Sequence, residues 1–457
     1  MPTLHFERAL LPTGWAEDVR MVLEGARISS VTAGVAPQTG DERHVIGVPG
    51  LANLHSHAFQ RGMAGLAERR GPATDSFWTW REEMYRFLRV LDPEDVQAIA
   101  ALSYAEMLEG GFTRVGEFHY LHHDVDGRPY GDIAEMAQSI AGAARGVGIG
   151  LTLLPCFYAH GGLGGLPPVE GQRRFINGID GFARLLDGSR RAIAGIEGAN
   201  LGVAPHSLRA VMPDEMVELR EMAGEMPIHI HAAEQIKEVD DCIAWSGKRP
   251  VEWLLDTQEI DARWCLIHTT HMTAEETRRL ARSGAIAGLC PVTEANLGDG
   301  LFNGRDFLEA GGRLGVGTDS NVQIGVALEL RQLEYAQRLK MALRNVMVPG
   351  EGQSTGRYLF DAALQGGAQA LGQLRDGGVA GLAVGAFADI VTLDAMHPAL
   401  VHRRGDQIID GWLFAGGEAV IDTVWCLGAK RVTGGRHIER ERLRAAFARV
   451  IAKVLAT

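Results

Sequence analysis

The sequence predicts an α/β protein whose larger part is a (β/α)8, TIM-like barrel, with a small β-sandwich domain built from both chain ends. From Val48 onward, apolar runs alternate with loops and helical patterns, as in parallel βα units. Both chain ends instead show short alternating segments that are separated by turn residues. At 457 residues the chain is long enough for one large core and an accessory domain.

The small β domain is expected to comprise residues 1–47 and 381–457, and the barrel residues 48–380. An amphipathic helix at about 439–455 closes the chain. The eight candidate barrel strands lie, in chain order, at about 48–55, 113–118, 149–156, 199–205, 226–231, 263–268, 285–290 and 313–318.

Capping patterns mark two of the helices between these strands. Asp92 precedes Pro93 at the start of a periodic stretch that ends at Gly110. Thr273 and Glu276 have the spacing of a capping box, and Gly284 follows that helix. Helices at these places are expected to connect successive strands of the barrel.

Composition excludes several classes of partner. The formal net charge of −12 disfavours binding to nucleic acid, since an acidic surface repels phosphate groups. No apolar run approaches the roughly 20 residues that a membrane span requires. Glu7 and Arg8 stand where a signal peptide would be apolar, so a cytoplasmic location is expected. The odd number of scattered cysteines favours reduced thiols over disulfides: Cys156, Cys242, Cys265, Cys290 and Cys426.

The first candidate strand ends in two histidines, His55 and His57. Alternate side chains of a strand share a face, so both imidazoles can point at one cation. An isolated pair of this kind is more often a surface loop feature. The interpretation as a metal site therefore depends on further ligands elsewhere in the chain.

Such residues follow the other candidate strands. In a (β/α)8 barrel, functional side chains gather at the carboxyl ends of the strands. The polar residues found at these ends are Glu117, His119 and Tyr120 after the second strand, His206 and Arg209 after the fourth, His229, His231 and Glu234 at the fifth, His268 and His271 at the sixth, and Asp319 after the eighth.

Taken together, these motifs resemble the amidohydrolase superfamily over nearly the whole chain. The resemblance rests on their order along the chain: His55-x-His57, then His229-x-His231-x-x-Glu234, then His268, then the run from Gly315 to Ser320. The segment 381–394 near the end of the chain fits the same family. The family implies a barrel that holds a metal ion at its carboxyl end.

The resemblance implies that His55, His57, His231 and Asp319 bind one divalent metal. This set of imidazoles and a carboxylate suits Zn, with Fe as an alternative. Dinuclear members bridge two metals through a carboxylated lysine on the fourth strand, but no lysine precedes Lys237 here. One metal is therefore expected, and the mononuclear members are mostly deaminases.

Hydrolysis at such a site needs an activated water and groups that carry protons. A bound divalent metal lowers the pKa of its water. By the resemblance, Asp319 and His268 are expected to accept a proton and to orient this water, while Glu234 carries protons to the leaving nitrogen. The division of labour between Glu234 and His268 stays open. His229 shares a strand face with His231, and a packing or supporting role is expected for it.

The residues after His57 indicate a substrate. Within the superfamily, the segment from His55 to Arg61 resembles the formiminoglutamate deiminases of histidine degradation. The implied reaction is the hydrolysis of N-formimino-L-glutamate to N-formyl-L-glutamate and ammonia. Because this linear amidine has two carboxylates, its pocket requires cations, and Arg81 and Arg209 are the candidates. The remaining candidates for substrate binding are Gln60, Tyr120 and His206.

Two alternatives remain. The same fold could deaminate an aromatic amine such as guanine or a modified adenine nucleoside, whose pocket would favour apolar stacking. The chain could also be a scaffold without catalysis, although such relatives typically lose metal ligands. A homodimer is expected from the resemblance alone. The glycine-rich segment 160–168 is equally well a mobile lid or an ordinary surface loop.

Overall fold

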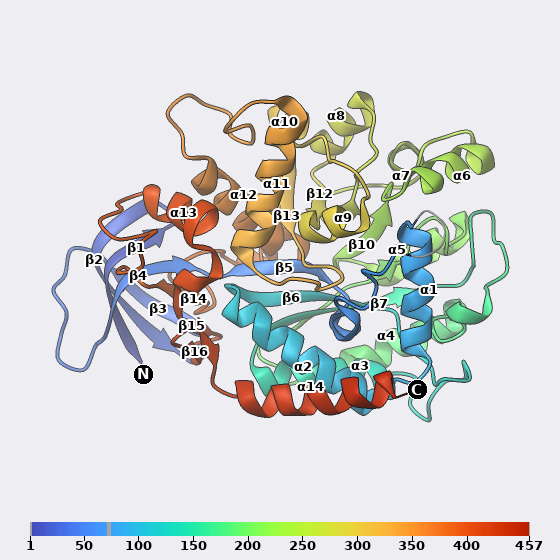
Figure 1. Ribbon diagram of the computed structural model, residues 1–457, viewed down its shortest axis with the longest axis horizontal. Coiled ribbons are helices and arrows are strands. Elements are labelled where there is room, and N and C mark those ends of the chain that lie inside the picture. Colours follow the sequence, from blue (N-terminus) through green and yellow to red (C-terminus); the bar gives the residue numbers. More distant parts are fainter. Residues whose placement is uncertain (1, 71–74, 457) are drawn as a thin grey trace.

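The predicted barrel is present in the computed structural model, which describes residues 2–70 and 75–456 (Figure 1). Its strands form two parallel sheets, in the orders β5-β6-β7-β8 and β10-β11-β12-β13, with β9 pairing to β7. The strands are β5 (Leu51–Ser56), β6 (Phe112–His119), β7 (Gly150–Phe157), β8 (Asn200–Leu201), β9 (Ala204–Pro205), β10 (Ile228–Ala232), β11 (Trp264–His268), β12 (Ile286–Leu289) and β13 (Arg313–Val316).

Parallel bridges at two seams close these sheets into a barrel. Val203, between β8 and β9, pairs with Ile228 of β10. Ser56 at the end of β5 pairs with Asp319, just beyond β13. Since all strands run in the same direction, their carboxyl ends open on one side of the molecule. The closure at Ser56 therefore places the first and eighth strand ends side by side.

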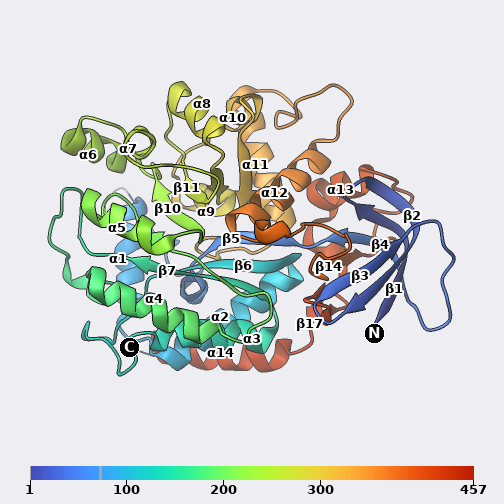
Figure 2. The same ribbon diagram turned by 180° about the vertical axis from the view of Figure 1, so that it is seen from behind.

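Helices cover the outside of the barrel, as Figures 1 and 2 show from opposite sides. Two of them begin where their capping patterns predict: Asp92 and Asp95 exchange hydrogen bonds at the start of α2, and Thr273 and Glu276 do so at α8. The helices of this part are α2 (Pro93–Glu109), α3 (Glu135–Val147), α4 (Ile179–Ile193), α5 (Pro213–Ala223), α6 (Ile236–Ser246), α7 (Pro250–Thr257), α8 (Ala274–Ser283), α9 (Pro291–Leu297), α10 (Gly304–Glu309), α11 (Val326–Met341) and α12 (Thr355–Ala370).

Both chain ends build a second sheet at one end of the barrel, as predicted (Figure 2). Its eight strands are hydrogen-bonded in the order β17-β16-β15-β14-β4-β1-β2-β3 and enclose a separate apolar core that includes Phe6, Met21 and Trp425. The strands are β1 (Thr3–Leu11), β2 (Gly14–Glu24), β3 (Arg27–Thr32), β4 (Glu42–Pro49), β14 (Ile390–Leu393), β15 (Ile421–Cys426), β16 (Ala429–Thr433) and β17 (Arg436–His437).

The single strand predicted over 48–55 is divided between the two sheets. β4 ends at Pro49, and β5 begins at Leu51. Gly50 lies between them, and a Cβ atom at this position would come within 2.3 Å of the Thr113 side chain. The chain crosses from the small sheet into the barrel at this close approach, which only glycine allows.

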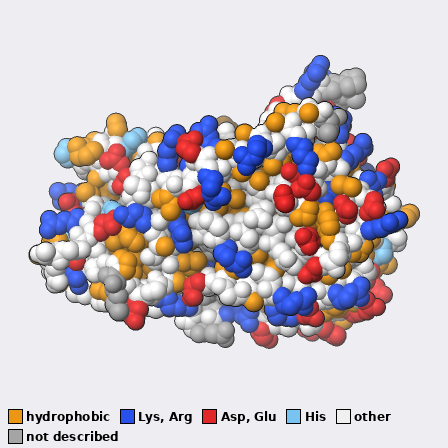
Figure 3. Space-filling view, turned by 90° about the horizontal axis from the view of Figure 1, so that it is seen from below, with side chains coloured by type: hydrophobic (Ala, Val, Ile, Leu, Met, Phe, Trp, Pro, Cys, Tyr) orange, Lys and Arg blue, Asp and Glu red, His pale blue; other side chains and the backbone are white. Residues whose placement is uncertain are grey.

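The carboxyl-terminal helix α14 (Arg440–Leu455) leaves the small sheet and runs along α2 (Figure 1). Lys453 binds Asp92 and Asp95 of the α2 start at 2.7 and 2.6 Å, and Arg440 pairs with Glu106 at 3.2 Å. On the face of the molecule that carries α14, acidic and basic side chains are interspersed with scattered hydrophobic ones (Figure 3). The helix therefore ties the end of the chain to the barrel.

One further helix, α1 (Phe77–Leu88), belongs to the long connection between β5 and α2. It stands at the end of the barrel onto which the strand ends open (Figure 1). A short helix, α13 (Gln407–Gly411), precedes β15. Within the described ranges, no helix is both long and apolar enough to cross a membrane.

Candidate active site

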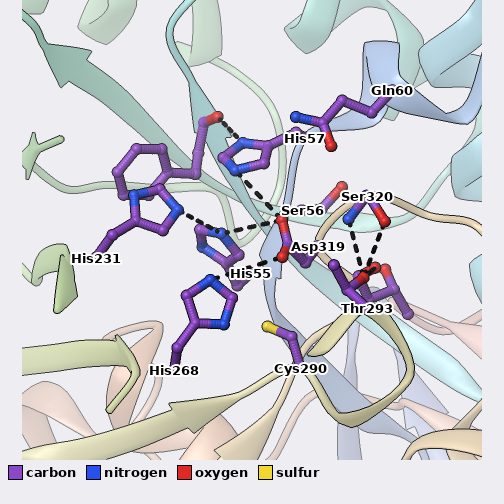
Figure 4. Close-up of polar contacts among 12 residues, drawn as sticks. His55, Ser56, His57, Gln60, His231, His268, Cys290, Thr293, Asp319 and Ser320 are labelled. Atoms are coloured by element: carbon purple, nitrogen blue, oxygen red, sulfur yellow. Dashed lines mark hydrogen bonds and ion pairs between the residues drawn. The ribbon is translucent and has the colours of Figure 1, made fainter. Parts of the chain in front are cut away.

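Four of the predicted site residues meet at the carboxyl end of the barrel. His55 and His57 lie at and just beyond the end of β5, His231 lies in β10, and Asp319 follows β13. In Figure 4 the ion pairs of His55 and His57 converge on the carboxylate of Asp319. All four residues are at most 5% exposed, so their polar groups are withdrawn from bulk water.

The potential ligand atoms of these residues are close to one another. The Nε2 atoms of His55 and His57 lie 3.6 and 3.4 Å from Oδ1 of Asp319. The Nε2 atom of His231 lies 3.1 Å from that of His55. Atoms of the three histidines thus fall within 4.8 Å of one another, as binding to one ion requires.

Hydrogen bonds to the backbone orient two of the imidazoles. The Nδ1 atom of His57 donates to the carbonyl of Phe118 at 2.8 Å, and that of His231 donates to the carbonyl of His206 at 2.9 Å. The lone pair of each ring is therefore left on Nε2, which faces the cluster. Burial lowers the pKa of His55 to about 3 and also lowers that of His57, so both rings are neutral, as metal ligands must be. This donor set fits a divalent cation.

Glu234 and His268 adjoin the cluster. The Nε2 atom of His268 lies 3.7 Å from Oε1 of Glu234 and 3.7 Å from Oδ2 of Asp319. Burial raises the pKa of Glu234 to about 7, although the charges of His268 and Arg209 oppose this shift. Burial alone would lower the pKa of His268, but the nearby carboxylates, first of all Glu234, raise it to about 10. At neutral pH a cationic imidazole thus faces a carboxyl group that can both take up and release a proton.

A cavity extends from this cluster towards α1. Its wall includes the catalytic candidates Glu234, His268 and Asp319. All five residues predicted to bind substrate also line it: Gln60, Arg81, Tyr120, His206 and Arg209. His55 is fully buried and its ring contacts that of His57 in the same cluster. The predicted metal ligands, catalytic residues and substrate-binding residues therefore lie in one place.

The sequence model of the amidohydrolase family matches residues 46–431. The chain belongs to the amidohydrolase family. A second model, for the N-terminal domain of the formimidoylglutamate deiminase HutF, matches residues 1–45. The resemblance inferred from the histidine and aspartate motifs is thereby confirmed.

Individual relatives match over all or most of the chain. The chain is 50% identical to formimidoylglutamate deiminase from Pseudomonas aeruginosa over 458 residues, which covers 100% of both chains. It is 29% identical over 370 residues to 5-methylthioadenosine/S-adenosylhomocysteine deaminase from Natronomonas pharaonis, covering 79% of this chain and 76% of the relative.

Solved structures agree with this assignment. The chain aligns with an amidohydrolase from Brucella melitensis at a TM-score of 0.96 and 58% identity, over 100% of both chains. An adenosine deaminase from Xanthomonas campestris with bound zinc gives a TM-score of 0.80 at 22% identity, over 100% of this chain and 98% of the other. The second likeness concerns the fold alone.

Sequence analysis did not identify Glu294 as part of this amidohydrolase site. Its Oε1 atom accepts hydrogen bonds from Nδ1 of His268 at 3.2 Å and from the backbone N–H of Cys290 at 2.8 Å. Glu294 lies on α9, which begins directly after the seventh strand. It fixes the ring of His268 so that Nε2 faces Glu234 and Asp319. A carboxylate four residues after the predicted strand end at Cys290 was the available signal.

Aromatic residues that sequence analysis left aside also form the cavity wall. Tyr158 follows β7 directly, at a strand end like the predicted residues. The other aromatic rings in the wall are Phe77, Trp80 and Tyr85, which lie on α1, and Phe175. The three α1 residues form a cluster of aromatics around Arg81 in the sequence. Their periodicity alone does not show whether they line a pocket or pack in the core.

The two arginines differ in their surroundings. The Nη2 atom of Arg209 lies 3.7 Å from Oε2 of Glu234. For Arg81, no ion pair within 4.0 Å is found in the described part of the chain, and its buried Nε atom has no hydrogen-bond partner there. By contrast, Arg61 of the motif after His57 pairs with Glu106 at 2.7 Å and does not belong to the cavity wall. Arg81 is thus a cation available to an anionic ligand.

The remaining polar candidates are placed as follows. Gln60 donates to the hydroxyl of Tyr120 at 2.8 Å, so these two residues act together. His229 donates from Nε2 to the carbonyl of Ala370 at 2.8 Å, which is a packing role of the kind expected for it. In the segment 160–168, His160 pairs with Glu215 of α5 at 3.0 Å. None of the described cavity-lining residues comes from that segment.

Proposed function

We propose that this amidohydrolase hydrolyses the C–N bond of N-formimino-L-glutamate, which consumes water and yields N-formyl-L-glutamate and ammonia. The observation that carries the proposal is that two arginines, one of them without an anionic partner among the described residues, share a cavity with the metal-ligand cluster. A substrate that carries a formimino group on its α-nitrogen and two carboxylates, one beside that nitrogen and one at the end of its side chain, matches this arrangement. The 50% identity to a formimidoylglutamate deiminase over the full chain supports the same conclusion.

His55, His57, His231 and Asp319 are proposed to hold one divalent metal ion, and Zn suits three imidazoles and one carboxylate. When bound there, such an ion lowers the pKa of a water molecule and polarises the formimino group. The absence of any lysine before Lys237 excludes a bridge through a carboxylated lysine from the fourth strand, which supports a single ion. Metal analysis of the purified protein identifies the ion.

The protonation states of Glu234 and His268 suggest how protons move. With a pKa of about 7, Glu234 can accept a proton from the attacking water and deliver it to the leaving nitrogen. His268 is held as a cation by Glu234, Glu294 and Asp319, so its Nε2–H can donate a hydrogen bond to the negative charge that develops during attack. This division assigns proton transfer to Glu234 and orientation to His268.

Arg81 and Arg209 are proposed to bind the two carboxylates of the substrate. Both line the cavity, and a guanidinium group can bind a carboxylate through two parallel hydrogen bonds. Gln60, Tyr120 and His206 add neutral donors and acceptors around the chain of the substrate. Burial first, and then the charge of Arg209, lowers the pKa of His206 well below its usual range, so His206 is neutral.

The test is an assay of ammonia release from N-formimino-L-glutamate by the purified, metal-loaded protein. Ammonia and N-formyl-L-glutamate are expected in equal amounts, and Asp319→Asn and Glu234→Gln are each expected to abolish most of the activity. A protein with its full metal complement that releases no ammonia from this substrate would contradict the proposal.

A second candidate is the deamination of an aromatic amine, which the aromatic residues of the cavity wall favour. The same ammonia assay with guanine and modified adenine nucleosides separates the two functions. For the wider setting, we infer a cytoplasmic homodimer. The cytoplasmic location is supported by the five buried cysteines, none of which forms a disulfide, and gel filtration tests the dimer.

A further inference from the structure

Trp78, at the start of α1, lies among three cations. The Cζ atoms of Arg81 and Arg209 are 4.7 and 5.8 Å from the centroid of its ring, and Nζ of Lys237 is 5.9 Å away. These cations belong to α1, to the segment after β9 and to α6. Trp78 itself is not one of the cavity-lining residues, whereas both arginines are. The indole therefore contacts the arginines from outside the cavity wall.

The two arginines act on the same part of the cavity. Burial raises the pKa of Tyr85, and the charges of Arg81 and Arg209 both oppose this shift. Both charges likewise oppose the effect of burial on the pKa of Tyr158. The Cζ atoms of both arginines lie 4.7 and 5.8 Å from one ring centroid, that of Trp78, so the two guanidinium groups converge.

Convergence of like charges is unfavourable unless other groups offset it. Glu234 offsets part of the charge of Arg209, at 3.7 Å, but Arg81 has no such ion pair among the described residues. Aromatic ring faces attract cations within about 6 Å, and Trp is the strongest of them. Trp78 is within this distance of both arginines, while Tyr85 reaches Arg81 at 5.6 Å and Phe77 reaches Arg209 at 5.7 Å. Of these rings, only Trp78 contacts both cations.

Local contacts hold the indole in place. The backbone N–H of Trp78 donates to the hydroxyl of Ser76, which caps α1, at 3.3 Å. The ring of Phe77 packs edge-on against Trp78 with centroids 5.1 Å apart. The first turn of α1 thus presents the indole in a defined position to the side chains of Arg81 and Arg209.

We propose that Trp78 is a positioning residue that holds Arg81 and Arg209 over one indole, as a preformed pair of cations for the two carboxylates of the substrate. The inference rests on the proposed function, which supplies the dicarboxylate. Trp78 acts through the arginines and does not touch the reacting atoms. Its loss should weaken substrate binding, because the arginines must then be ordered when the substrate binds. The chemical step at the metal cluster should be unchanged, so KM rises while kcat does not.

The experiment compares Trp78→Leu and Trp78→Phe with the unmodified holoenzyme. Trp78→Leu is expected to raise KM for N-formimino-L-glutamate about tenfold, the equivalent of losing two exposed cation–π contacts. Trp78→Phe keeps a ring face with a weaker attraction for cations and is expected to raise KM only about threefold. In both variants kcat and metal content should stay at the level of the unmodified protein. Arg86→Ala is the matched control, since it removes a solvent-exposed cation from the same helix.

Glutarate, which has two carboxylates but no formimino group, tests whether the contacts to the carboxylates are the ones affected. Its dissociation constant, measured by calorimetry on the holoenzyme, is expected to rise in parallel with KM in both variants. An unchanged glutarate affinity in Trp78→Leu, or a fall in kcat with KM constant, would overturn the proposal. If Trp78→Leu fails to fold, Trp78→Phe provides the test. An unchanged affinity of Trp78→Phe for glutarate would then overturn the proposal.

The two proposals fail in distinguishable ways. Absence of ammonia release by the unmodified, metal-loaded protein contradicts the proposed function. The glutarate measurement still judges Trp78 in that case, because it needs no turnover.

Discussion

The two ends of the active-site cavity are built differently. At the inner end, His55, His57, His231 and Asp319 project from barrel strands or directly follow them, and hydrogen bonds to backbone carbonyls orient two of the rings. At the outer end, Arg81 lies on α1, in the connection between β5 and α2, and contacts aromatic rings rather than carboxylates. The barrel closure thus holds the groups proposed for the chemistry, whereas an inserted helix holds a group proposed for recognition. Because these groups lie on different elements, a change in the connection between β5 and α2 can alter which substrate binds without altering the reaction.

Removal of the metal is expected to have the largest effect, because every proposed step depends on the inner end. Dialysis against a chelator should lower the rate of ammonia release by about a thousandfold or more, and added Zn should restore it. Glutarate should still bind at the outer end. Full activity of protein shown by elemental analysis to be metal-free would refute the role assigned to the four ligands.

Arg81→Met tests the outer end by removing one of the two cations. It is expected to lower kcat/KM for N-formimino-L-glutamate about a hundredfold, as the loss of a charged hydrogen-bonded pair implies. Most of the change should be in KM, and metal content should be unaffected. Arg86→Met, on the exposed side of the same helix, serves as control. If Arg81→Met deiminates normally, the outer end does not recognise carboxylates through this residue.

The smallest predicted effect concerns the ion pair between Arg209 and Glu234, which joins the two ends of the cavity. Since the pKa of Glu234 is about 7 and its ionised form accepts the proton, kcat/KM should fall about tenfold for each pH unit below that value. The positive charge of Arg209 favours ionised Glu234. Arg209→Gln should therefore raise the pKa of Glu234. The acidic limb of the pH profile of kcat/KM, where the value falls, should then move to higher pH.

A pH profile of kcat/KM measures both effects. Glu234→Gln, with its low residual rate, should lack the limb altogether. A limb that stays in place in Arg209→Gln would show that the two ends of the cavity are not electrostatically linked through this pair.

Much of the fold could be predicted because its signals are local. The capping residues Asp92 and Thr273 mark helix starts within single turns of chain, and apolar runs mark the buried strands of the barrel. The boundary between β4 and β5 at Gly50 is an exception, because the pattern of apolar residues does not mark it. Residues 48–52 are apolar throughout the crossing, so hydrophobicity alone cannot separate β4 from β5. The division follows from contact with Thr113, which is distant in the sequence.

The residues that sequence analysis missed share a property. Glu294 and Trp78 lie on helices, and each acts through a residue of another element. Glu294 is defined by its hydrogen bond to His268, which lies 26 positions earlier. Trp78 is defined by its contact with Arg209, which lies on a different part of the chain. The place of Glu294 just after a predicted strand end is a signal for the residue, but neither periodicity nor spacing identifies the partner of Glu294 or of Trp78.

Residue type, order and spacing carried the resemblance to the amidohydrolase superfamily, because each strand end has its own polar residues. That resemblance in turn predicted the metal ligands, the catalytic candidates and a dicarboxylate substrate. The three-dimensional closure of the barrel decided the geometry and the protonation states of the site. It joined His55 to Asp319 across 264 positions, set which nitrogen of His57 and His231 faces the cluster, and gave Glu234 and His268 their perturbed pKa values through burial and mutual contact. It also brought Arg81 and Arg209 to one indole. Hydrogen-bond direction, burial and the convergence of charges depend on distances between remote segments, and these exist only in the folded chain.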